Sequence, residues 1–264
     1  MLTTSLTPFA WPVVIYLTLA GAAAGTALAA AVARFGGQEA FARRGFLVAT
    51  AALALGAVFL IFDLESPASF GLILTSFNPA SAIAWGARAL VLFGAACLVA
   101  GLTRSRVAAG VAAGLAVAVA AYPAWVLHQA EARPLWQSLW IAPLLLASVL
   151  HMGLAGKVLL ERGSTSVSRG LEAGLVGAQV IFAALWLVSV TALRPEGVHR
   201  LLAGDLAPWL WLGFLAVGLV VPLLGLSRSS GIARLAALGA APLVGGLALR
   251  VVLILGGQGP AASF

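Results

Sequence analysis

The amino-acid sequence predicts an all-α, polytopic membrane protein, and three observations lead to this fold class. Apolar residues make up 62% of the 264 residues and charged residues only 9%, whereas soluble domains carry about 25% charged residues. The mean hydropathy of +1.08 excludes both a water-soluble globule and a disordered chain, which needs low hydrophobicity. The apolar runs are continuous, which favours helices, because strands of a membrane barrel need alternation over about ten residues.

Eight apolar runs have the length of a membrane-spanning helix, which needs roughly 20 mostly apolar residues. We expect these spans at residues 9–33, 45–64, 81–103, 106–128, 137–160, 168–192, 206–226 and 231–256. The first run is too long for a secretory signal peptide and lacks a basic flank, so it is interpreted as a span. Residues 1–264 therefore form a single integral membrane domain.

Glycine is abundant, at 30 residues, which suits helices that pack closely in lipid. Two examples are the run from Gly21 to Gly25 in the first span and the run from Gly110 to Gly114 in the fourth, each with two glycines four residues apart. We expect close helix contacts at both places.

The connections between spans set the orientation, because lysine and arginine in short loops favour the cytoplasm. The first, third, fifth and seventh connections hold ten basic residues, namely Arg34, Arg43, Arg44, Arg104, Arg106, Lys157, Arg162, Arg169, Arg228 and Arg234. The other side holds Arg133, Arg194 and Arg200. Both termini are therefore predicted to be extracytoplasmic in a multi-pass membrane protein.

All eight tryptophans fall toward the outer ends of the spans in this orientation. They are Trp11, Trp85, Trp125, Trp136, Trp140, Trp186, Trp209 and Trp211. An aromatic belt normally occupies both membrane interfaces. The excess of tryptophan at the outer ends indicates one of two arrangements. Either another protein covers the outer face, since tryptophan is enriched at protein interfaces, or the aromatic belt is one-sided.

Polar side chains share one depth, which is informative because charge inside a membrane is costly and usually functional. Arg88 lies about 10 Å and Arg250 about 9 Å below the outer ends of their spans, at 1.5 Å per residue. The whole set in the outer third comprises Tyr16, Asp63, Glu65, Arg88, Tyr122, His128 and Arg250.

These groups match an apolar ligand with two polar oxygens, such as a quinone. Tyrosine or arginine can donate to a ring carbonyl, and a partly buried carboxylate can relay protons. We therefore predict Glu65 and Asp63 as proton-relay residues. Tyr122, Tyr16, Arg88, Arg250 and His128 are the predicted ring-binding or charge-tuning residues. For single residues a structural role stays open: a helix end at Glu65, a kink at Tyr122, a belt position at Tyr16, a snorkelling Arg250, or an Arg88 that only neutralises Asp63 or Glu65.

The sequence also excludes several kinds of site. One cysteine, Cys97, excludes a disulfide framework and any self-contained iron–sulfur cluster. His128, His151 and His199 do not meet at one depth, so no haem with two histidine ligands is expected, and His151 is interpreted as a hydrogen-bonded core residue. We expect no metal site, no nucleotide motif and, because the positive charges are scattered, no nucleic-acid partner. If the chain takes part in redox chemistry, its electrons must pass to or from a partner that carries the metal centres.

Several segments resemble the NrfD/PsrC family, the integral membrane subunits of polysulfide-reductase-type complexes. The specific part runs from Phe62-Asp63-Leu64-Glu65-Ser66-Pro67 through Ser76-Phe77-Asn78-Pro79-Ala80-Ser81 to Ala84-Trp85-Gly86. Tyr122-Pro123, Arg133-Pro134-Leu135-Trp136 and Leu249-Arg250-Val251-Val252 with Gly256-Gly257-Gln258 also fit. The likeness covers essentially the whole chain.

The resemblance implies a site for menaquinone or another quinone in the bundle of the first four helices, with Glu65 and Tyr122 as site residues. It also implies a four-cluster iron–sulfur subunit docked on the outer face and a molybdopterin catalytic subunit beyond it, in the plasma (inner) membrane of a bacterium or archaeon. This chain would then exchange electrons and protons with the quinone without acting on the terminal substrate. Two alternatives stay open: a secondary transporter that uses Arg88 and Arg250 for a small solute, and a structural anchor without a quinone site.

Overall fold

The computed structural model describes residues 11–63, 81–131, 133–162, 167–193, 195–227 and 231–258, and it shows only helices and turns there. The elements in chain order are α1 (Trp11–Phe35), α2 (Glu39–Asp63), α4 (Ala82–Thr103), α5 (Arg106–His128), η2 (Pro134–Trp136), α6 (Ile141–Leu160), α7 (Arg169–Leu193), α8 (Pro195–Leu202), η3 (Trp209–Val220), α9 (Val221–Gly225), α10 (Ile232–Arg234), η4 (Leu235–Ala240) and α11 (Ala241–Gly256).

The predicted fold class is confirmed, since each expected span coincides with a helix. Within the described ranges, seven helices are long and apolar enough to cross a membrane, and the shorter apolar stretch Trp209–Gly225 takes the place of the seventh expected span. The main difference is at α2, which begins at Glu39 rather than at residue 45. Its first turns carry Arg43 and Arg44, which hydropathy alone assigns to a loop. The short helix α8 has no apolar run and was not expected.

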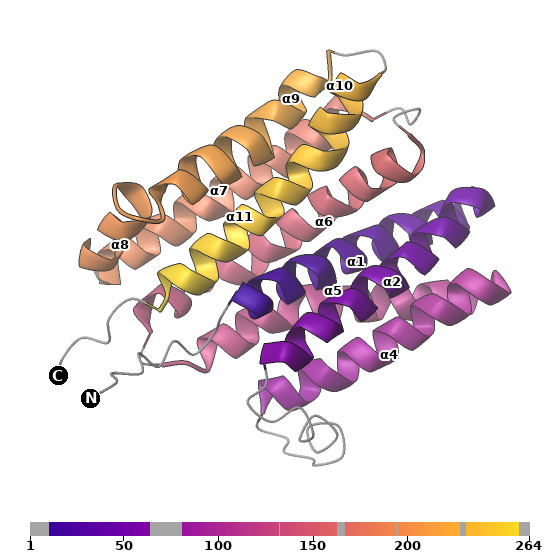
Figure 1. Cartoon of the computed structure of the whole chain (residues 1–264), viewed down its shortest axis with the longest axis horizontal. Coiled ribbons are helices and arrows are strands. Elements are labelled where there is room, and N and C mark those ends of the chain that lie inside the picture. Colours follow the sequence, from indigo (N-terminus) through magenta and orange to yellow (C-terminus); the bar gives the residue numbers. More distant parts are fainter. Residues whose placement is uncertain are drawn as a thin grey trace.

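The helices pack as two groups (Figure 1). One apolar core is built almost wholly from α1, α2, α4 and α5. The other is built from α6, α7, α8, η2, η3 and α11, together with Val14 of α1 and the end of α5. The first four spans therefore form a bundle of their own. Figure 1 shows α1 and α6 side by side where the two groups meet.

The contact between α1 and α6 depends on glycine. A β-carbon on Gly25 would lie 2.0 Å from the Val149 carbonyl oxygen, and one on Gly153 would lie 2.3 Å from the Gly25 carbonyl oxygen. Backbone therefore packs on backbone here, as small residues permit in membranes. The expectation for Gly21 to Gly25 is confirmed. It is wrong for Gly114, which has nothing within 4 Å of its β-carbon position.

The last two spans contain helical turns with the wider π hydrogen-bond pattern, in η3 and η4. A β-carbon on Gly218 of η3 would lie 2.5 Å from the Gly245 α-carbon of α11. The two spans thus cross as closely as α1 and α6 do. This contact fixes α11, which carries Arg250.

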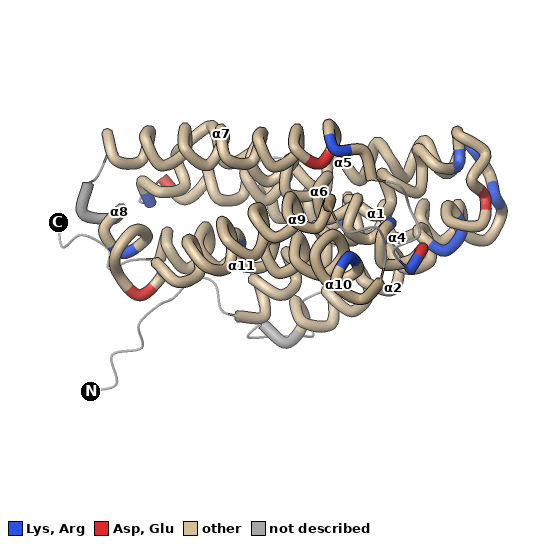
Figure 2. Tube along the Cα trace, turned by 90° about the horizontal axis from the view of Figure 1, so that it is seen from above, with Lys and Arg blue, Asp and Glu red and all other residues tan. Residues whose placement is uncertain are grey.

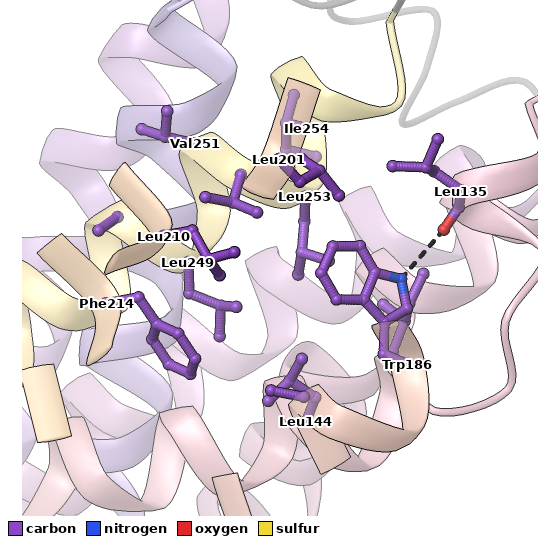
Figure 3. Packing of buried hydrophobic residues seen from close by; sticks show 14 of the residues in the cluster. Leu135, Leu144, Trp186, Leu201, Leu210, Phe214, Leu249, Val251, Leu253 and Ile254 are labelled. Carbon is purple, nitrogen blue, oxygen red and sulfur yellow. Dashed lines mark hydrogen bonds between the residues drawn. The ribbon is translucent and has the colours of Figure 1, made fainter. Parts of the chain in front are cut away.

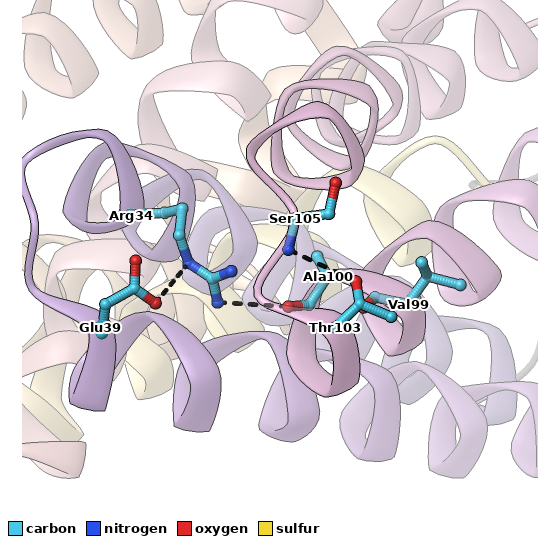
Figure 4. A network of polar contacts seen from close by, with 6 residues as sticks. All are labelled: Arg34, Glu39, Val99, Ala100, Thr103 and Ser105. Atoms are coloured by element: carbon cyan, nitrogen blue, oxygen red, sulfur yellow. Dashed lines mark hydrogen bonds and ion pairs between the residues drawn. The ribbon is translucent and has the colours of Figure 1, made fainter.

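Lys and Arg gather at one end of the helices and tryptophan at the other, and we call these ends the arginine side and the tryptophan side. Figure 2 shows the cluster of basic residues at the ends of α1, α2 and α4. Arg34 is buried there: its Nε lies 3.1 Å from Glu39 Oε2 and its Nη2 donates to the Ala100 carbonyl at 3.2 Å (Figure 4). Arg34 thus ties α1 to both α2 and α4.

Candidate functional site

The two tyrosines of the chain meet inside the first helix group. Tyr16 of α1 and Tyr122 of α5 share a hydrogen bond between their hydroxyl groups, and Tyr16 is buried. Gly86 of α4 makes room for the second ring, because a β-carbon there would lie 2.5 Å from Tyr122 Cε2. The sequence thus places two phenols and a glycine from three helices at one point on the tryptophan side.

An apolar groove leads to this tyrosine pair. It has a volume of about 280 Å³ and lies between the α2 residues from Thr50 to Leu60 and the α4 residues from Ala87 to Leu98, with Tyr16 also in its lining. Among the described residues that line it, only Tyr16 and Thr50 carry polar side chains, and the Thr50 hydroxyl donates to the Phe46 carbonyl of its own helix. The groove is therefore open to lipid along an apolar wall and offers one phenol.

Arg250 lies on the other side of α1 and does not snorkel. Its side chain is buried, Nε donates to the Leu17 carbonyl at 2.9 Å, and Nη1 donates to the Gly246 carbonyl at 2.8 Å and to Ser148 Oγ at 3.4 Å. Gly21 gives the guanidinium its space, since a β-carbon there would lie 2.2 Å from Nη2. The side chain therefore links α11 to α1 and α6.

A small cavity of about 20 Å³ lies against Arg250, with room for about one water molecule. Leu17 and Pro123 line it, and each follows directly on one of the two tyrosines in the chain. Arg250 therefore lies next to the segments of α1 and α5 that carry the two tyrosines, but it does not line the groove between α2 and α4.

The other predicted site residues fall into different places. Arg88 is half-buried on α4, one residue beyond the groove residue Ala87, and its Nη1 donates to the Ala84 carbonyl at 3.0 Å. His128 is exposed at the end of α5. Asp63 is the last residue of α2, where its side chain is outside the described part, and Glu65 lies outside the described residues.

Two of the segments that carry the family resemblance lie against each other. Trp136 Nε1 donates to the Leu253 carbonyl at 2.8 Å, and Arg133 Nη1 to the Gly257 carbonyl at 3.4 Å. Trp186 Nε1 in turn donates to the Leu135 carbonyl at 3.2 Å (Figure 3). The turn before α6 is therefore fixed to the end of α11 by the indole of Trp136 and to α7 by the indole of Trp186.

Sequence reasoning missed a buried carboxylate on the arginine side. The predicted site residues do not include Glu172 of α7, although its Oε1 lies 2.8 Å from His151 Nε2 of α6 and both side chains are buried. Gln179 Nε2 lies 2.9 Å from His151 Nδ1. The interpretation of His151 as a hydrogen-bonded core residue is confirmed. The spacing of Glu172 and Gln179, seven residues apart on one helix face, was the available signal.

Comparison with known proteins gives the family of this chain. A family model named NrfD_2 and described as "Polysulfide reductase" matches residues 2–263. The chain belongs to this NrfD-type polysulfide reductase family. It is 28% identical to the C subunit of polysulfide reductase from Wolinella succinogenes, over 94% of this chain and 93% of that protein. It is 27% identical to Protein NrfD of Escherichia coli, over 94% of each.

Membership in the NrfD-type family and the apolar helices make this a multi-pass membrane protein. Among the residues that the structure describes, no three His, Cys, Asp or Glu side chains converge as they would around a metal ion. The tyrosine pair with its lipid-facing groove is the arrangement in the first helix group that can accept an apolar, oxygen-bearing ligand.

Proposed function

We propose that this chain is the quinone-reacting membrane subunit of a respiratory oxidoreductase complex. It exchanges electrons and protons between a membrane quinone, menaquinone or a similar one, and an iron–sulfur partner on the tryptophan side. The observation that carries the proposal is the hydrogen-bonded pair of Tyr16 and Tyr122 beside an apolar groove between α2 and α4. The family membership supports the same conclusion.

The groove suits both parts of a quinone, the apolar isoprenoid tail and the ring with its carbonyl oxygens. Its alanine, leucine and valine lining accepts an isoprenoid tail, and the outer residues Val91 and Leu98 are 53% and 42% exposed, so the groove is open to lipid. The Tyr16 hydroxyl gives a ring carbonyl a donor in a site with few polar groups, where a hydrogen bond orients the ligand. When bound, the quinone supplies two-electron, two-proton redox chemistry.

Tyr122 acts through its hydrogen bond to Tyr16. A phenol donates one hydrogen and accepts others, so Tyr122 can donate to Tyr16 while Tyr16 donates to the ring. Gly86 allows the Tyr122 ring to pack directly against α4, because any side chain at this position would occupy the space of the ring. Glu65 stays our proposal for the proton relay on the tryptophan side, together with Asp63.

The proposed partner lies on the tryptophan side. The relative from Wolinella succinogenes is named as one lettered subunit of polysulfide reductase, so that relative is one polypeptide of several. Five of the eight tryptophans here, Trp11, Trp85, Trp125, Trp140 and Trp211, are 38–49% exposed, so their rings are available to a bound protein. We propose that an iron–sulfur subunit docks on this face and a molybdopterin catalytic subunit lies beyond it. The tryptophan side is then extracytoplasmic.

Removal of one phenol tests the site. Tyr122→Phe and Tyr16→Phe should each lower quinol-dependent turnover of the assembled complex about threefold to tenfold, the effect of losing a hydrogen bond of about 0.5–1.5 kcal/mol. Glu65→Gln should lower it as well. Thr191→Val is the matched control, because it removes an exposed hydroxyl that bonds to its own helix, at the Leu187 carbonyl.

Each variant complex is also assayed with an artificial electron donor that bypasses the quinone. That activity and the subunit composition should stay as in the wild type. Normal quinol kinetics in all three site variants would contradict the quinone site and favour a chain that serves only as an anchor.

A further inference from the structure

A polar trio lies between α6 and α7, away from the tyrosine pair and unused by the proposed quinone chemistry. It consists of Glu172, His151 and Gln179, whose side chains are only 2–3% exposed. His151 occupies the centre, with its Nε2 2.8 Å from Glu172 Oε1 and its Nδ1 2.9 Å from Gln179 Nε2. An ionisable group inside a membrane protein is costly, and its presence indicates a function.

The hydrogen bonds determine which ring nitrogen of His151 carries hydrogen. An amide nitrogen only donates, so Nδ1 accepts from Gln179. The same amide nitrogen lies 3.3 Å from the Leu175 carbonyl and donates to it as well, which keeps the amide in this orientation. Both contacts are satisfied by an imidazole that carries one hydrogen, on Nε2 and directed at Glu172.

A neutral imidazole leaves the charge of Glu172 without a cation. Among the described residues, His151 is the one basic side chain within ion-pair distance of this carboxylate. Of the charged residues on the neighbouring helices, Lys157 is bonded to Gln38 Oε1, Arg250 to the Leu17 carbonyl, and Arg169 is exposed one turn before Glu172. Arg234 ends α10, and neither α9 nor η4 contains an ionisable residue.

A buried carboxylate without a cation is neutralised by taking up a proton. We propose that Glu172, His151 and Gln179 form a proton-binding site that takes up one proton from the aqueous phase on the arginine side. Glu172 lies three residues after the start of α7, a rise of about 4.5 Å along the helix, so the path from water is short. The added proton makes the trio electrically neutral, either on the Glu172 carboxylate or, after rotation of the Gln179 amide, on His151 Nδ1.

The site gives the second helix group a role of its own. The tyrosine pair exchanges protons near the tryptophan side, whereas this trio exchanges them with the opposite side of the membrane. Proton binding here requires neither a quinone nor a partner subunit, so its test is independent of the proposed quinone site.

Infrared difference spectroscopy of the full chain, recorded between high and low pH, tests the proposal. We expect one component of the carboxylic-acid absorption that appears on acidification to shift in heavy water and to be absent from Glu172→Gln. This variant keeps an oxygen that accepts from His151 Nε2, so the fold should be retained. Glu161→Gln, which changes a glutamate at the end of α6, should keep the absorption.

A second measurement leaves Glu172, His151 and Gln179 unchanged. Nitrogen NMR of ring-labelled histidine, assigned with His128→Asn and His199→Asn, reports directly whether His151 gains a second hydrogen. An acid absorption that depends on Glu172, or a second hydrogen on His151, supports the proton site. If neither the carboxylate nor the ring changes its protonation over the pH range in which the chain stays folded, the proposal is wrong.

Discussion

Arg250 shows at the scale of one residue how a buried charge is accommodated by neutral oxygen acceptors of the described residues. Its guanidinium donates to two backbone carbonyls and one serine hydroxyl from three helices. Such carbonyls are available because α1 and α11 approach closely beside Gly21. The side chain therefore acts as a cross-link between helices as well as a source of positive charge beside the small cavity.

Arg250→Lys should destabilise the chain by about 1–3 kcal/mol, because an ammonium group on a shorter, linear side chain cannot meet all three acceptors and leaves buried oxygens unpaired. Gly21→Ala should destabilise the wild type by a similar amount through overpacking, about 1–3 kcal/mol. The variants are compared by denaturant unfolding in detergent.

The two substitutions together should be less costly than their sum, by about 0.5 kcal/mol or more, because they share one contact. The alanine β-carbon collides with Nη2, an atom that lysine lacks. Additive effects would show that the steric contact between Gly21 and Arg250 does not exist in the folded chain.

At the scale of elements, the crossing of α1 and α6 joins the two helix groups. Gly25→Ala and Gly153→Ala should each destabilise the chain by about 1–3 kcal/mol, since their β-carbons would meet backbone atoms that cannot rotate away. Gly114→Ala is the control, with open space around the added methyl group. It should be neutral or stabilise α5 by up to about 1 kcal/mol. Thermal unfolding of the purified variants measures the difference, and equal behaviour of Gly25→Ala and Gly114→Ala would contradict the crossing.

The elements themselves could be predicted from the sequence because hydropathy over twenty residues is a local property. It placed α5 at residues 106–128 without error and α7 within one residue. It misplaced the start of α2, whose first turns carry arginines that extend beyond the apolar run. The packing partner of a glycine is not local, so Gly25 and Gly114 looked alike in the sequence although only one meets another helix.

The site was predictable only in part, for the same reason. Depth along a helix follows from residue counting, and it brought Tyr16 and Tyr122 to one level, where the structure pairs them. The direction in which a side chain points around the helix axis depends on how the helices pack, and it does not follow from residue counting. Arg250 shares that level but faces a separate cavity on the other side of α1. Glu172 was missed because it lies in the first turn of α7, where a charged side chain usually reaches water, and residue counting does not show that this one is buried against α6.

At the scale of the whole molecule, charge and aromatic residues give the chain two different ends. The helices alternate in direction, so tryptophans at the start of α1 and α4 and near the end of α5 and α7 come to one side. The basic residues at the end of α1 and the start of α2 come to the other (Figure 2). Because lysine and arginine favour the cytoplasm, we propose that the tryptophan side, with the tyrosine pair and the partner surface, faces outward.

Labelling of single cysteines in intact cells tests this orientation. The natural Cys97 is fully buried, and Cys97→Ala gives a background without a thiol. In this background Glu131→Cys, exposed on the tryptophan side, should react with a membrane-impermeant maleimide in intact cells or spheroplasts. Arg104→Cys, exposed in the turn between α4 and α5 on the arginine side, should react only after the membrane is permeabilised.

The two variants control for each other, because each is exposed and each must become reactive in permeabilised cells if the chain is folded. Reaction of Arg104→Cys in intact cells together with protection of Glu131→Cys would reverse the orientation. The tyrosine pair would then lie near the cytoplasm and the polar trio near the outside. A partner that docks on the tryptophan side would have to be cytoplasmic, so this one measurement decides on which side of the membrane the complex exchanges electrons.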